Sequence, residues 1–156
     1  MRSSIVMLLL LAPALGWSQS KEYTEKKNRL LVETSPFEKI IARSEPRELE
    51  YEDSDVVVFK GLRDQALVHL LIVPKRRINT LNEATEEDAL LLGKMILVAQ
   101  QIAKEKGIAE TGYRLVFNTN EDSGQSVFHI HLHLLGGMKL GPMVDQTWST
   151  SGEREK

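Results

Sequence analysis

Three of the four histidines of the chain stand at alternate positions, at His129, His131 and His133. Because successive side chains of a β-strand point to opposite faces, a strand over residues 127–135 would place all three imidazoles on one face. The apolar side chains between them would then point into a core: Phe128, Ile130, Leu132 and Leu134. Imidazole titrates near neutral pH, so one ring can attack while its neighbours donate hydrogen bonds. The spacing therefore favours acid–base and nucleophilic chemistry on a phosphate.

Two other interpretations of the three histidines stay open on spacing alone. They could form a solvated polar face, because an exposed histidine needs no function. They could also hold zinc or copper, since His-x-His is a common ligand pair and zinc accepts three histidines plus water. A metal-binding histidine often donates its second ring N–H to a carboxylate. The carboxylates nearest to the three histidines in the sequence are Glu121 and Asp122, and their distance slightly disfavours a metal site.

The residues before the histidines strengthen the phosphate interpretation. Residues 123–126 read Ser-Gly-Gln-Ser and offer backbone N–H groups, an amide and a hydroxyl, all of which suit phosphate oxygens. Alone, such a stretch more often forms a simple turn, so it gains its value from the histidines beside it.

Composition limits the class of protein. The chain has 156 residues, of which 27% are charged and 42% hydrophobic, and this predicts a globular domain with its own core. The net charge of −2 gives no bulk attraction for nucleic acid, so we expect no nucleic-acid partner. Cysteine is absent, which excludes disulfides, thiol catalysis and cysteine metal sites.

Residues 1–20 read as a secretory signal peptide. Arg2 precedes an apolar run over residues 5–15, and small residues follow at Ser18 and Ser20. We expect cleavage after Ser20 and export to the periplasm or the medium. The alternative is a membrane tether formed by an uncleaved segment, although the apolar run is short against the roughly 20 residues that span a bilayer. Residues 21–34 are charged and weakly periodic, which predicts an N-terminal extension, either a mobile lead-in or an extra first-turn element.

The rest of the chain alternates between helical and strand patterns. Ser35 can cap a short helix that runs to residue 42, with Pro36 in its first turn and Glu38 completing a capping box. A long helix opens at residues 85–88 and ends near Gly107, with an apolar stripe over residues 91–102. Strands are expected at residues 49–51, 56–59, 68–73, 113–118 and 127–135. This order predicts an α+β domain over residues 35–140, with a mainly antiparallel sheet and an irregular tail over 141–156.

Residues 124–137 resemble the signature of the histidine triad family. Their sequence is Gly-Gln-Ser-Val-Phe-His-Ile-His-Leu-His-Leu-Leu-Gly-Gly, and its last part resembles the Hint branch, the purine nucleoside phosphoramidases. Residues 35–41, 68–75 and 113–118 resemble the family's opening helix, the strand with its fourth histidine and the strand before the triad. The resemblance implies an α+β fold with a five-stranded sheet, one short and one long helix, and a sheet that extends across a homodimer. It also favours the stripe over residues 91–102 as the dimer interface.

The resemblance implies a role for each matching residue. His131 would attack the α-phosphorus of a purine nucleotide conjugate or phosphoramidate, and water would hydrolyse the resulting nucleotidyl-histidine. His129 would orient His131 through its backbone carbonyl, while His133 and His69 would bind phosphate and relay protons. Ser126 would bond the leaving group or a phosphate oxygen. Further nucleotide-binding residues would be Asn118, Gly124 and Gln125 at the phosphate, and Phe37, Ile40 and Leu62 at the base. No metal and no cofactor is implied.

The sequence departs from the Hint branch in three places. Lys60 and Gly61 stand where the branch has a histidine and an aspartate that binds the ribose hydroxyls, and glycine offers no carboxylate for a diol. The tail after Gly137 differs from the branch's short Trp-Pro-Pro-Gly end, and a role for Trp148 stays open. Export is the third departure, since Hint-like proteins are usually cytosolic. The missing acid keeps a non-catalytic nucleotide-binding module as an alternative, beside a metal-binding protein of the envelope.

Overall fold

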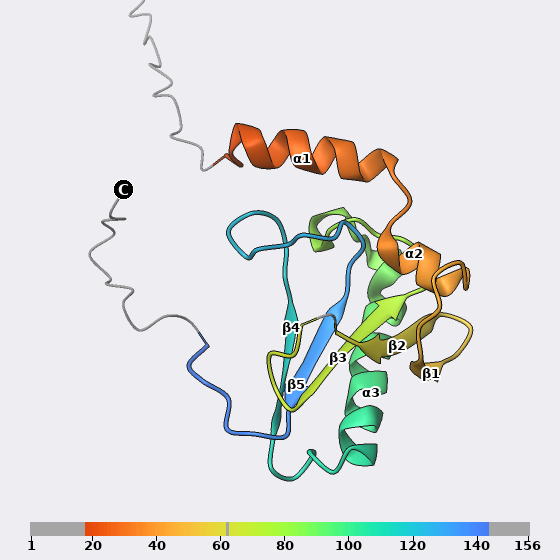
Figure 1. The fold of residues 1–156 in the computed structure, drawn as a ribbon, viewed down its shortest axis with the longest axis vertical. Coiled ribbons are helices and arrows are strands. Elements are labelled where there is room, and N and C mark those ends of the chain that lie inside the picture. Colours follow the sequence, from red (N-terminus) through yellow and green to blue (C-terminus); the bar gives the residue numbers. More distant parts are fainter. Residues whose placement is uncertain (1–17, 62, 144–156) are drawn as a thin grey trace, which may run out of the picture.

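The computed structural model describes residues 18–61 and 63–143, so most of the expected signal peptide, Leu62 and Trp148 lie outside the described residues. Figure 1 shows the helices and strands in their chain order. The elements are α1 (Lys21–Val32), α2 (Pro36–Ile41), β1 (Leu49–Glu52), β2 (Val56–Lys60), β3 (Val68–Pro74), two short 3₁₀ turns (Leu81–Glu83 and Glu86–Asp88), α3 (Ala89–Glu105), β4 (Tyr113–Phe117) and β5 (Leu132–Gly136). No helix within the described ranges is long and apolar enough to cross a bilayer.

The five strands form one sheet in the order β1-β2-β3-β5-β4, and each neighbouring pair is antiparallel. This confirms the predicted α+β class and the five-stranded antiparallel sheet. The predicted hairpin turn before β2 is also confirmed, because Asp53 Oδ1 accepts from the N–H groups of Asp55 and Val56 at 2.7 and 2.9 Å. Lys94 of α3 pairs with Asp53 at 2.9 Å, which fixes one flank of α3 beside this hairpin.

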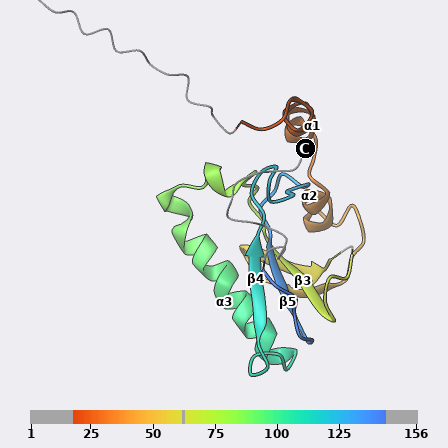
Figure 2. The same ribbon diagram turned by 90° about the vertical axis from the view of Figure 1, so that its left-hand side faces the viewer.

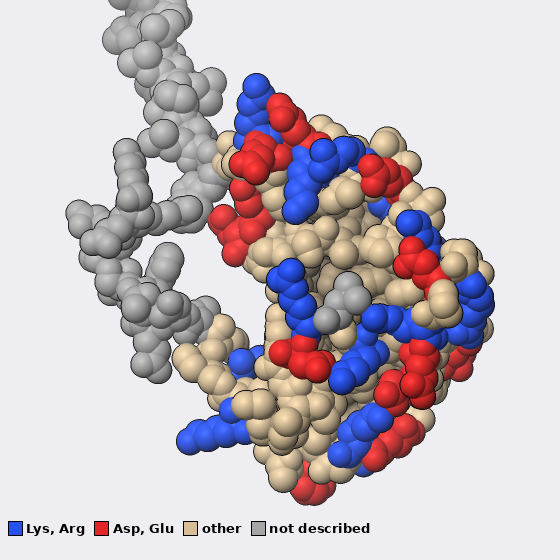
Figure 3. Space-filling view, viewed as in Figure 1, with Lys and Arg blue, Asp and Glu red and all other residues tan. Residues whose placement is uncertain are grey.

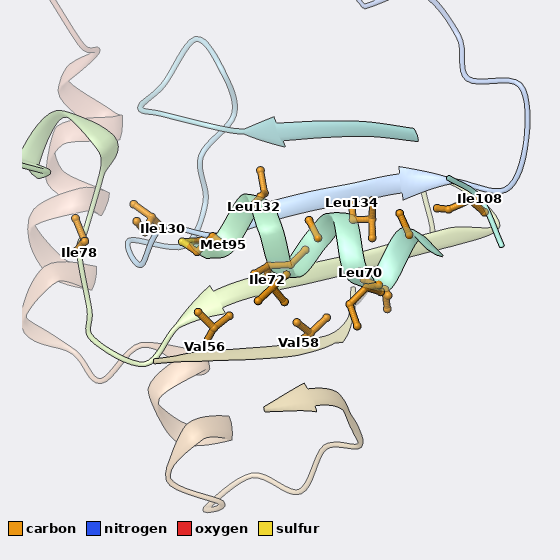
Figure 4. Close-up of a cluster of buried hydrophobic side chains, with 14 residues drawn as sticks. Val56, Val58, Leu70, Ile72, Ile78, Met95, Ile108, Ile130, Leu132 and Leu134 are labelled. Carbon is orange, nitrogen blue, oxygen red and sulfur yellow. The ribbon is translucent and has the colours of Figure 1, made fainter. Parts of the chain in front are cut away.

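The larger core lies between the sheet and α3. Figure 2 shows α3 on one side of the sheet and α2 on the other. Met95, Val98 and Ile102 of α3 are buried against apolar side chains of β2, β3 and β5, several of which are drawn in Figure 4. Each fully buried side chain of this kind contributes about 1.5–3 kcal/mol. Of the two alternatives for the stripe over residues 91–102, core or dimer interface, the structure shows core within one chain for these residues; periodicity shows an apolar face without showing what covers it.

A smaller core lies on the opposite face, under α2. Phe37 and Ile40 pack against side chains of β2 and β3, including Phe59 and Leu71. The predicted capping box is confirmed, because Glu38 Oε2 accepts from the N–H of Ser35 at 2.7 Å and Ser35 Oγ accepts from the N–H of Phe37 at 3.1 Å. The box fixes where α2 begins, and so it fixes which side chains α2 presents to the sheet.

The last strand is shorter than predicted. Instead of residues 127–135, β5 covers Leu132–Gly136, and the segment before it is irregular. That segment is held to the connection after β3, where the N–H of Ile130 donates to the carbonyl of Ile78 at 2.7 Å. Ile130, Leu132 and Leu134 still point into the core under α3, as predicted, but Phe128 packs edge-on against Tyr23 of α1 at 5.9 Å between ring centroids.

The N-terminal extension is a complete helix, α1, rather than a mobile lead-in or a single turn. Ser20 caps it, since its Oγ accepts from the N–H of Tyr23 at 3.1 Å. None of its residues is buried, because it leans on the rest of the chain along only one side. Most of its residues are charged or polar, so its few apolar side chains do not predict a core-facing helix from the sequence alone.

Candidate active site

A cavity of about 720 Å³ opens on the α2 face of the sheet. The sequence-predicted residues that line it are Phe37, Ile40, His69, Asn118, Gly124, Gln125, Ser126, His131 and His133. His129 does not line it, and Leu62 lies outside the described residues. The structure thus brings together two of the three clustered histidines, the distant His69 and the loop before β5 around one space.

His131 lies buried at the inner end of this cavity. Its ring centroid is 5.0 Å from that of Phe37 and 4.9 Å from that of His133. Its Nδ1 is 2.9 Å from the carbonyl oxygen of His129, and because a carbonyl only accepts, Nδ1 carries the proton and Nε2 carries the lone pair. Burial lowers the pKa of His131 below its ordinary value of 6.5. The ring is therefore a neutral imidazole with a free Nε2 at neutral pH.

A chain of hydrogen bonds runs through the other two imidazoles. His69 Nδ1 lies 2.7 Å from the carbonyl oxygen of Arg63, so Nδ1 is the donor and His69 Nε2 is the acceptor. That Nε2 accepts from His133 Nδ1 at 2.9 Å, and His133 Nε2 then accepts from the side-chain amide of Asn118 at 3.4 Å. Burial, reinforced by the neighbouring imidazoles, lowers the pKa of His133 to about 4. The His133 ring is therefore neutral at pH 7, and the tautomer of each ring is set by its hydrogen-bond partner.

His129 is fully buried and takes no part in the cavity wall. Its Nε2 donates to the carbonyl oxygen of Pro74 at 2.7 Å, while Nδ1 has no partner among the described residues. Burial lowers the pKa of His129 to about 4, so the ring stays neutral. The three imidazoles lie on one side as predicted, since the His129 ring is 5.8 Å from that of Phe37, which also contacts His131; His129 differs in being buried against Pro74 instead of lining the cavity.

The loop before β5 is tied internally, which limits how it can bind an anion. The N–H groups of Gly124 and Gln125 donate to the carbonyls of Glu121 and Asn120 at 2.8 and 3.0 Å. The buried side chain of Gln125 accepts from the N–H of Asn120 at 2.9 Å and donates to the carbonyl of Asn79 at 2.7 Å. Ser126 is exposed, and its N–H donates to no acceptor among the described residues. The backbone N–H groups of residues 124–126 were predicted to bind phosphate. Of these, only the N–H of Ser126 has no acceptor among the described residues and could bind an anion.

The apolar part of the cavity extends beyond the predicted side chains. Phe37 and Ile40 form part of the wall, and Phe59 and Leu71 complete it. These two residues come from β2 and β3, and both belong to the small core under α2. Their sequence pattern is that of ordinary buried strand residues, so only the position of α2 shows that they line a site.

Comparison with known proteins identifies the family. A family model described as "Scavenger mRNA decapping enzyme C-term binding" matches residues 34–145. The purine nucleoside phosphoramidase of Escherichia coli (strain K12) is 48% identical over 114 residues, which cover 73% of this chain and 96% of that protein. A HIT family hydrolase from Legionella pneumophila Philadelphia 1 is 42% identical with a TM-score of 0.68, covering 69% of this chain and 96% of its own. A HIT family hydrolase from Clostridium thermocellum is 42% identical with a TM-score of 0.69, covering 72% and 98%.

This chain belongs to the histidine triad family. The family match begins at residue 34, so α1 precedes the part of the chain that it covers. Even so, α1 contacts the loop before β5: Tyr23 donates to the carbonyl of Gln125 at 3.3 Å, and Lys27 donates to Asn120 Oδ1 at 3.5 Å. In this histidine triad protein, a helix outside the matched region therefore supports the loop that carries Ser126.

Gly61 lies directly against a histidine of the triad site. A Cβ atom built at Gly61 would stand 2.8 Å from His69 Cε1 and 2.9 Å from His69 Nδ1, closer than real Cβ contacts allow. The carboxylate that the resemblance leads one to expect at this position has no room beside the His69 ring. Glycine here is therefore a packing requirement of the histidine chain.

The donor set of this histidine triad site does not fit a metal ion. Nδ1 of His131 and both ring nitrogens of His69 are engaged with carbonyls or with His133, so three lone pairs do not converge on one point. Among the described residues, no group of three His, Asp or Glu side chains is arranged to hold a metal.

Proposed function

We propose that this chain hydrolyses a phosphoramidate, or a related bond, at the α-phosphorus of a purine nucleoside monophosphate conjugate. One observation carries the proposal: the carbonyl of His129 holds the Nδ1 proton of His131 at 2.9 Å, which leaves the Nε2 lone pair beside the cavity. The name of the E. coli relative, purine nucleoside phosphoramidase, supports the same class of reaction.

The proposed reaction is a double displacement at phosphorus. Nε2 of His131 attacks the phosphorus and the bond to the leaving amine breaks, while the amine takes a proton from solvent at the open side of the cavity. Water then attacks the phosphorus, the bond to Nε2 breaks, and a proton of that water returns to solvent. The products are the free amine and the nucleoside monophosphate. A covalent intermediate of this kind divides one difficult step into two easier ones.

The phosphate oxygens need donors that are already in place. The amide of Asn118 and the N–H and hydroxyl of Ser126 lie in the cavity wall and supply them. His133 presents a lone pair in its resting tautomer, so it donates to phosphate only after the His69–His133 pair gains a proton. Such a proton compensates the negative charge that develops on phosphoryl oxygens, and positioned acid–base groups contribute roughly 10²–10⁴-fold each.

The base would occupy the apolar part of the cavity. Phe37, Ile40, Phe59 and Leu71 form this part, and about 720 Å³ is within the usual range of roughly 300–1,000 Å³ for small-molecule sites. A flat purine ring buries its faces well against aromatic and branched side chains. The phosphate then reaches the histidines at the inner end.

The test is hydrolysis of adenosine 5′-phosphoramidate by the purified chain, with and without a chelator. We expect turnover that the chelator does not change, and loss of more than about 10³-fold in kcat for His131→Asn. Gln101→Ala, on the exposed face of α3, serves as the control and should retain full activity. Full activity of His131→Asn would exclude His131 as the nucleophile. Tight nucleotide binding without turnover across a phosphoramidate panel would replace the hydrolase proposal with a non-catalytic binding module.

We also propose that two copies of the chain pair through β4. Because β4 is an edge strand of the sheet, its outer N–H and C=O groups have no strand partner among residues 18–61 and 63–143 of one chain. Lys94 marks the flank of α3 that faces the β1–β2 hairpin, because it pairs with Asp53. Ile96 is two residues further along, about 200° around the helix, so it lies on the opposite flank, toward the β4 edge. Its side chain is 47% exposed and that of Leu97 is 64% exposed. Ile96→Glu should convert the dimer to a monomer in sedimentation velocity, while Gln101→Glu on the other flank should not.

Export is a further proposal, motivated by the n-region, apolar run and small residues of residues 1–20. The measurement is fractionation of cells that express the full chain, with the mass of the recovered protein. A cytoplasmic protein that retains Met1 or Arg2 would contradict export.

A further inference from the structure

Two arginines line the cavity beside the residues used in the proposed hydrolysis. Arg47 follows α2 and Arg63 follows Gly61, and both line the cavity. We call this pair the basic rim. Figure 3 shows Lys and Arg side chains on both sides of the tan surface at the middle of the face that carries α2 and β2. The basic rim plays no part in the hydrolysis proposed above.

Arg47 is held in a position from which it can bind a ligand. Its Nη1 donates to the carbonyl of Lys60 at 2.9 Å, and its guanidinium lies 5.7 Å from the centroid of the Phe59 ring. Its Nε and Nη2 donate to no acceptor among the described residues. A guanidinium fixed in this way loses little conformational entropy when its remaining donors bind an anion.

Arg63 connects the basic rim to the histidine chain. Its backbone carbonyl accepts the proton of His69 Nδ1 at 2.7 Å, whereas its side chain is exposed and pairs with no carboxylate of the described residues. The backbone of one rim residue is therefore hydrogen-bonded to the histidine chain.

The acids near the rim are already paired. Asp64 lies 3.4 Å from Lys60, and Glu45, which also lines the cavity, lies 3.5 Å from Lys39. With these acids paired and His131 and His133 neutral, the guanidiniums of Arg47 and Arg63 are the cavity's charged groups that have no carboxylate partner among the described residues. Their fork geometry matches the oxygens of a phosphate, while a sugar diol needs an acceptor that Gly61 does not supply.

We propose that the substrate carries a second phosphate, on its ribose, and that the basic rim binds it. The proposal rests on the proposed function, because the first phosphate must lie at His131. The ligand class is thus a nucleotide with a phosphate at the 2′ or 3′ position in addition to the reacting 5′ phosphorus. A free diol at the same place would leave both guanidiniums without an anionic partner.

The test compares matched ligands on the full chain. Isothermal titration calorimetry with adenosine 5′-monophosphate, adenosine 2′,5′-bisphosphate and adenosine 3′,5′-bisphosphate measures the preference for a second phosphate and its position. A charge-assisted contact of about 1.5–3 kcal/mol corresponds to roughly 10–100-fold tighter binding of one bisphosphate. In Arg63→Gln and Arg47→Gln, the ratio of bisphosphate to monophosphate affinity should fall toward one. Arg43→Gln, at an exposed arginine that pairs with Glu52, should leave the ratio unchanged.

Equal affinity for all three nucleotides, or a preference that survives both rim substitutions, would overturn the second-phosphate proposal. Turnover separates this outcome from failure of the hydrolase proposal. If adenosine 5′-phosphoramidate is hydrolysed but a 3′-phosphate and a 2′-phosphate bring no gain in kcat/KM, the hydrolase holds and the rim assignment fails. If bisphosphates bind tightly through the rim but no phosphoramidate is hydrolysed, the rim assignment holds and the hydrolase fails.

Discussion

Arg77 Nε donates to the carbonyl oxygen of Phe128 at 2.9 Å, one residue before His129. The same guanidinium donates to the carbonyls of Glu33 and Leu30 at 2.8 and 3.2 Å, and it pairs with Glu38 at 3.1 Å. One mostly buried side chain therefore joins the end of α1, the first turn of α2 and the segment that leads to His131, the proposed nucleophile.

Replacing Arg77 should loosen all three elements together. We expect Arg77→Ala to lose about 2–4 kcal/mol of unfolding free energy, since several charge-assisted hydrogen bonds disappear, and to lower kcat. Urea denaturation and steady-state kinetics measure the two effects. Arg43→Ala, an exposed arginine in a surface pair, is the matched control and should lose no more than about 1 kcal/mol. Equal losses in the two variants would show that Arg77 is only a surface contact.

Tyr23 should stabilise the loop before β5 from outside the family domain. Its ring packs edge-on against Phe128 and its hydroxyl donates to the carbonyl of Gln125. We expect Tyr23→Ala to lose about 1–2 kcal/mol and to speed amide hydrogen exchange over residues 119–128. Glu25→Ala, at an exposed position of the same helix, is the control. Unchanged exchange in Tyr23→Ala would mean that α1 does not hold the loop.

Gly61→Ala should damage the histidine chain. The new Cβ would stand 2.8 Å from His69 Cε1, so the ring must move and its hydrogen bond to His133 must lengthen. We expect kcat to fall by about 10²-fold, at the low end of the roughly 10²–10⁴-fold attributed to one positioned acid–base group, while circular dichroism stays unchanged. Gly141→Ala is the control, because a Cβ atom at this position would meet no atom of the described residues within 4 Å. Its kcat should equal that of the wild type. Wild-type kcat in Gly61→Ala would refute the packing role of this glycine.

Stability should fall with acid because of His129. Its pKa is about 4 in the folded chain, against 6.5 for an unperturbed ring, so between these values the unfolded chain binds a proton that the folded chain does not. Folding free energy is therefore lost as pH falls from about 6.5 to about 4, by up to about 3 kcal/mol from this ring. Chemical denaturation at a series of pH values measures the slope. His129→Asn should have a shallower slope, and an identical slope would contradict the assignment.

The position of export cleavage should follow from the cap of α1. Ser20 Oγ accepts from Tyr23 N–H, and Ser20 N–H donates to Glu121 Oε2 at 2.6 Å. Cleavage after Ser20 would remove a cap that typically contributes about 1 kcal/mol, whereas cleavage after Ser18 would keep it. The cap therefore favours a mature chain that begins at Gln19, in place of the cleavage after Ser20 that the sequence pattern predicts, and intact-mass spectrometry distinguishes the two. A mature chain that begins at Lys21 would contradict this expectation.

Local rules predicted the parts of the fold whose causes are local. The capping box at Ser35 and Glu38, the turn at Asp53 and the end of α3 near Gly107 depend on neighbours within a few residues, and all three are confirmed. The stripe on α3 was correctly predicted as apolar, but what covers it depends on tertiary structure.

The candidate site shows the same division. The alternation of side chains along a strand predicted that His131 and His133 share one face. It could not show that the His129 ring is buried and donates to the carbonyl of Pro74. The contacts of α1 join residues about a hundred positions apart, and the basic rim depends on two turns meeting at a cavity. Such pairings have no local signature, so only the three-dimensional arrangement identifies them.

The hydrogen bond from His131 Nδ1 to the carbonyl of His129 also has a regiochemical consequence. A phosphorylated histidine exists as two isomers, and here the Nδ1 position is blocked by its own carbonyl partner. Any covalent adduct on this ring should be the Nε2-linked isomer alone. Phosphorus NMR of the trapped adduct can identify which isomer forms. This tests the His131–His129 hydrogen bond without any measurement of rate.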